Sequence, residues 1–250
     1  MKYFITLLLT ALILVQCSPT EKPTQWQPLF NGEDLNDWTP RIFGYPTGEN
    51  FGNTFRVEDG LLKIRYDAYD SMRGRFGALH YNEPQSSYRL RVEYRFVGEK
   101  AIGTPDWSWR DSGVQFHGQT PGSMQPDQTF PNCLEFNFHG SDPDNLRPVG
   151  AICTLGTLIE INGGDNTAFS TAPLVSKSFI GDQWVTIEID VTDTLIRHFA
   201  GGEEILSFSN PRLQPADSTQ SASTLTGGYI SLQSNGHPID FRKIEILTYE

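Results

Sequence analysis

The chain has 250 residues, of which 38% are hydrophobic, and it carries a formal net charge of -11. This length suits one generous domain, because all-β sandwiches of this size commonly remain undivided. So acidic a surface argues against nucleic acid or an anionic membrane surface as the partner.

The first residues are typical of an export signal. A largely apolar run from Phe4 to Val15 is too short to cross a bilayer, and the chain turns polar after Cys17. The four residues ending at Cys17 resemble the box cut by bacterial lipoprotein signal peptidase, although Gln16 stands where a small residue is usual. We therefore expect a signal peptide over residues 1–16, a lipidated tether over 17–27 and one domain over 28–250. The protein would be exported to the periplasm or outer membrane and would contact membrane only through its lipid anchor. Ordinary secretion, with Cys17 lost or left free, is the alternative.

Alternating apolar and polar residues predict strands along most of the chain, most clearly over 88–96 and 184–191. The dipeptides Asp59-Gly60 and Gly201-Gly202 predict tight hairpins, since both tolerate positive φ. Further strands are expected near 76–81, 112–117, 133–138, 228–233 and 239–247, and no segment has a sustained helical period. We predict an all-β fold, a two-sheet antiparallel jelly-roll sandwich. The long segments 98–111, 118–132 and 140–182 are candidate functional loops.

Two cysteines remain once Cys17 is set aside, Cys133 and Cys153. A disulfide between them is predicted because export leads to an oxidising compartment. Two buried free thiols are the alternative, since the separation of their Cα atoms decides the matter and the sequence does not contain it.

Several motifs, taken in order, resemble the 3-keto-disaccharide hydrolase domain family. They are Pro28-Leu-Phe-Asn-Gly-Glu-Asp-Leu-Asn-Asp-Trp38, Phe55-Arg-Val-Glu-Asp-Gly-Leu61, Asp111-Ser-Gly-Val-Gln-Phe-His117, Asn132-Cys-Leu-Glu-Phe136, Gly227-Gly-Tyr-Ile-Ser-Leu-Gln233 and Pro238-Ile-Asp-Phe-Arg-Lys-Ile-Glu-Ile246. The resemblance extends from about Gln27 to Glu250. It implies a concanavalin A-like jelly roll, activity on glycosides oxidised at C3 of the sugar, and kinship with Bacteroidetes lipoproteins.

Two predicted strands each combine an apolar face with a polar, titratable face. Residues two apart project to the same side of a strand, which groups Glu135, Asn137 and His139 on one strand and Gln115 with His117 on the other. By analogy with concanavalin-like folds, this outer face is the carbohydrate cleft. A solvated sheet with two incidental histidines is the competing interpretation.

Sandwich glucanases with the implied fold carry the pattern Glu-x-Asp-x-x-Glu along one strand. The matching stretch here is Glu135-Phe-Asn137-Phe-His139-Gly140, in which only the first carboxylate is present. Hydrolysis by paired carboxylates needs two of them. Direct hydrolysis is therefore disfavoured unless Asp111, Asp142 or Asp144 reaches the site from a loop.

A 3-keto sugar needs less from the enzyme, because its carbonyl acidifies the proton on C2. One base, a cation or donor for the enolate and an acid for the leaving oxygen suffice for β-elimination and hydration. His117 or Glu135 is the candidate base, His139 the acid, and Arg75 or a metal the enolate partner. The family resemblance also raises the chance of a divalent metal, with His117, Glu135 and His139 as ligands.

The candidate substrate-binding residues share polar or aromatic side chains near the expected cleft: Arg75, Trp107, Trp109, Gln115, Asn137, Gln233 and His237. The two tryptophans can stack on a pyranose or anchor their loop. There is no nucleotide-binding fingerprint, so a separate sugar 3-dehydrogenase is expected to make the 3-keto substrate. A non-catalytic carbohydrate-binding protein and a direct glycoside hydrolase are the competing hypotheses.

Overall fold

The computed structural model describes residues 25–166, 168–215, 217 and 219–249. Cys17 and the expected signal peptide lie outside these residues. Among the residues described, no helix is long and apolar enough to cross a membrane.

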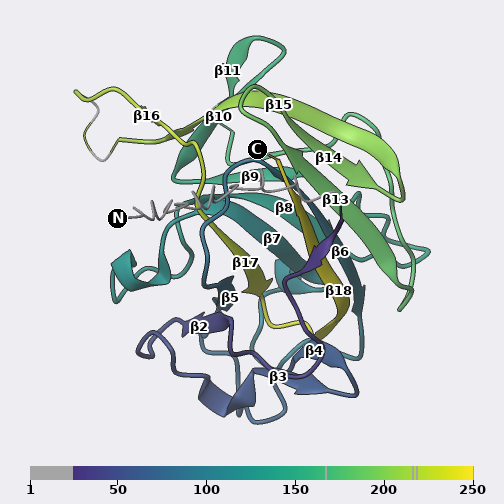
Figure 1. The fold of residues 1–250 in the computed structure, drawn as a ribbon. Coiled ribbons are helices and arrows are strands. Elements are labelled where there is room, and N and C mark those ends of the chain that lie inside the picture. Colours follow the sequence, from purple (N-terminus) through teal and green to yellow (C-terminus); the bar gives the residue numbers. More distant parts are fainter. Residues whose placement is uncertain (1–24, 167, 216, 218, 250) are drawn as a thin grey trace, which may run out of the picture.

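Two antiparallel sheets lie face to face (Figure 1). The larger has eleven strands. Nine of them follow in the order β11 (Gly164–Asn166), β10 (Thr157–Ile161), β15 (Glu203–Leu213), β14 (Ile196–Ala200), β13 (Val185–Val191), β6 (Tyr88–Phe96), β18 (Ile239–Thr248), β4 (Leu61–Ile64) and β3 (Phe55–Glu58). The short strands β1 (Gln27–Pro28) and β16 (Ser223–Thr224) pair with β18 and β15.

The smaller sheet has seven strands and carries the candidate site. Its order is β12 (Ser170–Thr171), β9 (Ile152–Leu155), β8 (Cys133–His139), β7 (Asp111–Gly118), β17 (Tyr229–Ser234), β5 (Gly77–Tyr81) and β2 (Trp38–Ile42). Three short 3-10 helices lie in loops: η1 (Phe51–Asn53), η2 (Asp106–Ser108) and η3 (Pro121–Ser123). The predicted two-sheet antiparallel sandwich is confirmed.

The core lies between the two sheets and follows the predicted alternation. On β6 every second residue from Tyr88 to Phe96 is buried. Tyr94 stacks on Phe138 of β8 with ring centroids 4.0 Å apart, which joins the two sheets directly. Burial of such apolar side chains is the main favourable contribution to folding.

Both predicted hairpin turns are present. Asp59 and Gly60 have φ of 57° and 73°, and Glu58 pairs with Leu61 across them. Positive φ at both central residues matches the right-handed twist of the flanking strands. Gly201 and Gly202 make the same kind of connection between β14 and β15.

The segment 140–182, which the sequence predicts to be a loop, contains strands in the structure. It contains β9, β10, β11 and β12, and β9 carries part of the site. The strand β9 is only Ile152–Leu155, and three of its four residues are buried. So short a run, buried on both faces, has no polar and apolar alternation by which to recognise it.

Candidate functional site

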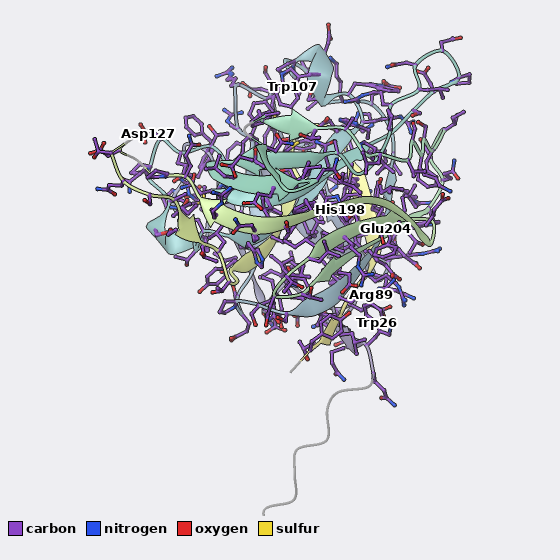
Figure 2. All side chains as sticks on the ribbon, turned by 90° about the horizontal axis from the view of Figure 1, so that it is seen from above. Trp26, Arg89, Trp107, Asp127, His198 and Glu204 are labelled. Carbon is purple, nitrogen blue, oxygen red and sulfur yellow. The ribbon has the colours of Figure 1, made fainter. Side chains whose placement is uncertain are left out.

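Polar side chains gather on the outer face of the seven-stranded sheet. Directly paired residues share a face, and β7 is paired with β8 so that Gln115 lies opposite Glu135 and Asp111 opposite His139. The intervening apolar residues of both strands belong to the core. Figure 2 shows Trp107 on this outer side, away from Arg89 and Trp26 at the other sheet.

A pocket of about 430 Å³ opens on this face. Its lining combines polar residues with aromatic and aliphatic ones: Trp107, Asp111, Phe130, Glu135, Asn137, His139, Arg147, Cys153, Leu155, Phe169, Ser170, Gln233 and Asn235. The loop between β7 and β8 extends to the β2 edge of the sheet, where buried Arg41 donates to the carbonyl of Gln125 at 3.0 Å.

Glu135 lies buried at the floor of the pocket. Its Oε2 accepts hydrogen bonds from Nε2 of Gln115 at 2.9 Å and from Nε2 of Gln233 at 2.8 Å. Its Oε1 accepts one from Nδ2 of Asn137 at 3.4 Å. Burial raises the pKa of Glu135 to about 7, the charge of Asp111 adds to this, and the Gln115 hydrogen bond opposes it. A carboxyl group with such a pKa can accept and return a proton near neutral pH.

Gly113 of β7 leaves the space that the Glu135 side chain occupies. A Cβ at position 113 would lie 2.7 Å from Cγ and 2.8 Å from Cδ of Glu135. We therefore expect Gly113→Ala to displace the carboxyl group, and a displacement near 1 Å typically costs about 10²-fold in rate. Steady-state kinetics measure this loss, and Gly122→Ala, in open space on the loop, is the control that should keep wild-type rates. Wild-type activity in Gly113→Ala would show that the Glu135 position is unimportant.

A second polar cluster surrounds Asp111 at the end of the paired strands. Its Oδ2 lies 3.0 Å from Nη2 of Arg147 and 3.1 Å from Nε2 of His139. Its Oδ1 accepts from Nδ2 of Asn235 at 2.8 Å. Nδ1 of His139 donates to the carbonyl of Pro148 at 2.9 Å, so both nitrogens of the ring face oxygen atoms. The fixed positive charge at this end of the pocket is therefore the guanidinium of Arg147, which is always protonated.

Buried amides connect the two clusters. Nδ2 of Asn235 also contacts Oε1 of Gln233 at 2.6 Å, and Gln233 in turn donates to Glu135. On the other side, Ser231 donates to Oε1 of Gln115 at 2.8 Å. A connected hydrogen-bond network of this kind holds its members in one arrangement. The orientation of the Glu135 carboxylate therefore depends on three strands.

His117 does not join Glu135. The alternation of β7 ends there, since His117 has φ of 48° and the pairing of β17 with β7 shifts register between Tyr229 and Ser231. The His117 ring lines other cavities, with residues such as Asp193 and Asn132. Sequence spacing alone assumes a regular strand, and the bulge breaks that assumption.

His117→Asn is therefore expected to keep catalysis within about twofold of wild type, because the residue does not line the pocket. Asparagine tolerates the left-handed backbone conformation, so the fold should survive. Kinetics on the substrate that wild type cleaves provide the measurement, with His139→Asn as the matched histidine replacement inside the pocket. A large loss in His117→Asn, with an unchanged melting temperature, would return His117 to the catalytic set.

Three other expected site residues also lie elsewhere. Arg75 stacks over the ring of Phe51 at 4.8 Å and pairs with Asp70, outside the pocket. His237 is buried near the Phe96 ring, 5.5 Å between centroids. Trp109 lines a neighbouring cavity of about 470 Å³ that shares Trp107 and Arg147 with the pocket. Trp107 is half exposed and lines both.

The predicted disulfide is wrong, because Cys133 and Cys153 are buried free thiols. In the register of β8 and β9, Cys133 pairs with Leu155 and Cys153 with Glu135, so the cysteines are diagonal neighbours. Diagonal neighbours lie about 7–8 Å apart, whereas a disulfide needs Cβ atoms about 3.5–4.5 Å apart.

The metal set expected from His117, Glu135 and His139 does not assemble. His117 lies apart, and both nitrogens of His139 already contact protein oxygens. Across the described ranges, no group of three or more His, Cys, Asp and Glu side chains is arranged to hold a metal ion. These residues therefore do not fit a resident metal, and no step below depends on one.

Sequence reasoning missed Arg147, Asn235, Phe130 and Phe169 as pocket residues. Asn235 continues the period of two set by Ser231 and Gln233, so its side of the sheet was recognisable. Arg147 and the two phenylalanines come from loops and short connections, for which periodicity has no signal.

Comparison with known proteins agrees with this architecture. The chain is similar in structure to a proposed glycosyl hydrolase from Parabacteroides distasonis ATCC 8503, with 15% identity, a TM-score of 0.56, and coverage of 90% of this chain and 94% of that one. It is also similar to the laminarinase from Rhodothermus marinus, with 11% identity, a TM-score of 0.54, and coverage of 92% and 98%. A third structure, the Bacillus licheniformis beta-glucanase, has 12% identity, a TM-score of 0.51, and coverage of 89% and 97%. At these identities the likeness shows the fold alone.

No curated protein matches the chain. A family profile does match, over residues 25–247, which is nearly all of the described structure. The family predicted from the sequence motifs is thereby confirmed, and with it a carbohydrate-active protein in general terms. The chain belongs to the family of 3-keto-alpha-glucoside-1,2-lyase-like domains.

Proposed function

We propose that this protein cleaves 3-keto-glycosides by β-elimination and then hydrates the product, which amounts to net hydrolysis. The observation that supports this most is Glu135, a buried carboxyl group with a pKa raised to about 7, at the floor of a pocket whose other end holds the guanidinium of Arg147. A base of that strength beside a cation suits removal of a proton next to a carbonyl.

In the first step the Glu135 carboxylate takes the proton from C2 of the sugar. The electron pair of that bond moves into the C3 carbonyl and forms an enolate. The enolate then collapses: C3=O re-forms, a C1=C2 double bond forms, and the bond from C1 to the leaving oxygen breaks. Water subsequently adds to C1 while C2 regains a proton, which yields the free 3-keto sugar.

The developing negative charge on O3 requires a positive partner. Arg147 supplies it, because its guanidinium is held at the pocket by Asp111 and by the carbonyl oxygens of Trp107 and Trp109. This replaces Arg75 in the role expected from the sequence. Both nitrogens of His139 are engaged, so we assign the return of a proton to the leaving oxygen to Glu135, which holds the proton from C2.

The amides of the pocket suit recognition of a sugar. Within the described part of the chain, the buried side-chain oxygens of Asn137 and Asn235 have no hydrogen-bond partner. Buried acceptors of this kind are seldom left unpaired, because each costs free energy comparable to a lost hydrogen bond. Sugar hydroxyl groups would donate to them, and the exposed Trp107 face would cover the ring.

Direct glycoside hydrolysis is a second candidate, because Asp111 lines the same pocket as Glu135. Two carboxylates facing one bond are what a glycosidase needs. However, both oxygens of Asp111 are already engaged, by Asn235, His139 and Arg147. We therefore favour elimination, with Asp111 as the group that positions Arg147 and His139.

The decisive experiment compares a 3-keto-glucoside with its unoxidised parent in D2O, with and without chelator. Elimination predicts release of the aglycone from the 3-keto compound alone and deuterium at C2 of the sugar product. Release from both compounds without deuterium at C2 would establish direct hydrolysis instead, and binding without release would establish a carbohydrate-binding protein.

The biological setting that we propose follows from this chemistry. A separate sugar 3-dehydrogenase would supply the substrate, because elimination requires a carbonyl at C3 that this reaction does not make. The apolar run before Cys17 supports export and lipid anchoring in the periplasm or outer membrane. Metabolic labelling with a fatty acid, compared between wild type and Cys17→Ala, tests the anchor.

A further inference from the structure

The pocket has a polar end and an apolar end, with Glu135 between them. Asp111 and His139 stand at one end of the paired strands β7 and β8. In the opposite direction along β8, Cys133 pairs with Leu155 of β9. Residues of a strand advance about 3.3 Å each, so Leu155 lies on the other side of Glu135 from His139.

Phe169 completes the apolar end. It directly precedes β12, and its carbonyl accepts a hydrogen bond from the amide of Thr154 at 2.9 Å, next to Leu155. The Phe169 side chain lines the pocket although it is 67% exposed. Exposure of a large apolar side chain at the rim of a pocket is unfavourable in water and marks a surface that a ligand can cover.

The chemistry of the reaction orients the substrate in this divided pocket. If C2 lies at Glu135, C1 and C3 project to opposite sides of it, because both are bonded to C2. The oxygen on C3 becomes negative and belongs with Arg147 at the polar end. C1 and the leaving group then point toward Leu155 and Phe169.

The apolar end offers few partners to a hydroxylated leaving group. Burial, with the charge of Glu135, raises the pKa of the Cys153 thiol to about 12, so this group stays neutral. Ser170 is the other polar side chain that lines this end. A second sugar presents hydroxyl groups around its whole edge, and each one buried without a partner would lower affinity.

We infer that the preferred substrates carry an apolar ring as the leaving group, such as a cycloalkyl or aryl alcohol, which packs on Leu155 and Phe169, in preference to a second sugar. This inference rests on the proposed function for the orientation of the substrate. It names Leu155 and Phe169 as specificity-determining residues.

The test uses two 3-keto-glucosides whose leaving groups are both primary alcohols of similar acidity. One carries cyclohexylmethanol, and the other carries glucose through its 6-hydroxyl group. Because the same kind of bond breaks in both compounds, a difference in kcat/KM reports the contacts that each leaving group makes with the protein. We expect kcat/KM to be about tenfold higher for the cyclohexylmethyl compound, which corresponds to burial of roughly 55 Å² of apolar surface.

Phe169→Ser and Leu155→Asn should lower kcat/KM for the cyclohexylmethyl compound about tenfold and leave the disaccharide nearly unchanged. Leu174→Ser is the control, since Leu174 is also exposed, at 68%, and does not line the pocket. It should leave both values at wild type. A disaccharide turned over as well as or better than the cyclohexylmethyl compound would overturn the inference and leave the proposed elimination intact.

Calorimetric binding of the two unoxidised parent glucosides separates this inference from the chemistry. If no 3-keto compound is cleaved, the proposed function fails. Even then, the apolar end is supported if the cyclohexylmethyl parent binds more tightly than the disaccharide parent and if Phe169→Ser abolishes this difference in affinity. Equal binding of both parents in wild type, with no effect of Phe169→Ser, would contradict the apolar end itself.

Discussion

Replacing Glu135 by glutamine is expected to lower kcat for a 3-keto-glucoside by about 10²–10⁴-fold, the usual contribution of a general base. Glutamine has nearly the same shape and can still accept from Gln115 and Gln233 through its amide oxygen, so the pocket should keep its form. The melting temperature should not fall, because the substitution removes a buried ionisable group.

The pH dependence of the wild-type enzyme tests the same residue. The general base must be deprotonated, so kcat/KM should rise with pH through about 7, the raised pKa of Glu135. Glu135→Gln should lose this rise together with the rate. A flat wild-type profile between pH 5 and about 9, or an unchanged rate in Glu135→Gln, would assign the proton transfer to another group.

Acidification is expected to destabilise the folded protein strongly between about pH 6.5 and pH 4. Burial lowers the pKa of His80 to about 3 and of His117, His198 and His237 to about 4. The unfolded chain, with ordinary histidines near 6.5, binds more protons than the folded chain throughout this range. The stability that these histidines contribute is therefore complete above about pH 6.5 and is lost as pH falls toward their folded pKa values.

Glu135 acts in the opposite direction. Its folded pKa lies above its unfolded value, so between about pH 4.5 and 7 the folded state holds a proton that the unfolded state has released. On unfolding near pH 5.5, the four histidines take up about four protons and Glu135 releases about one. The net uptake is therefore about three protons. The free energy of unfolding should then fall by up to about 4 kcal/mol per pH unit at the steepest point.

Urea unfolding at a series of pH values measures this slope. His198→Phe is the informative variant, since His198 is buried among Phe116, Phe136 and Phe208 in the core. Because the neutral His198 takes up a proton on unfolding, its replacement should reduce the slope by the equivalent of about one proton. A free energy of unfolding that is independent of pH over this range would mean that the buried histidines are not neutral as described.

The sequence alone was sufficient for the fold class, most strands and the family. Alternation of period two requires one buried and one exposed face, and the long runs of β6 and β13 show it over whole strands. The two hairpin dipeptides were also recognisable because positive φ restricts which residues fit. For the site, the same local rule was sufficient to group Glu135, Asn137 and His139, since all three belong to one regular strand, β8.

The rest depends on contacts between residues far apart in sequence. The bulge that removes His117 from the pocket arises where β7 meets β17, more than a hundred residues later. Arg147 enters from a loop, and the diagonal register of β8 and β9 keeps Cys133 and Cys153 apart. The raised pKa of Glu135 is likewise tertiary, because it comes from burial beside side chains of three strands. Periodicity reports which face of one strand is buried, whereas register, bulges and loop closure are decided by the energies of pairing and packing between strands.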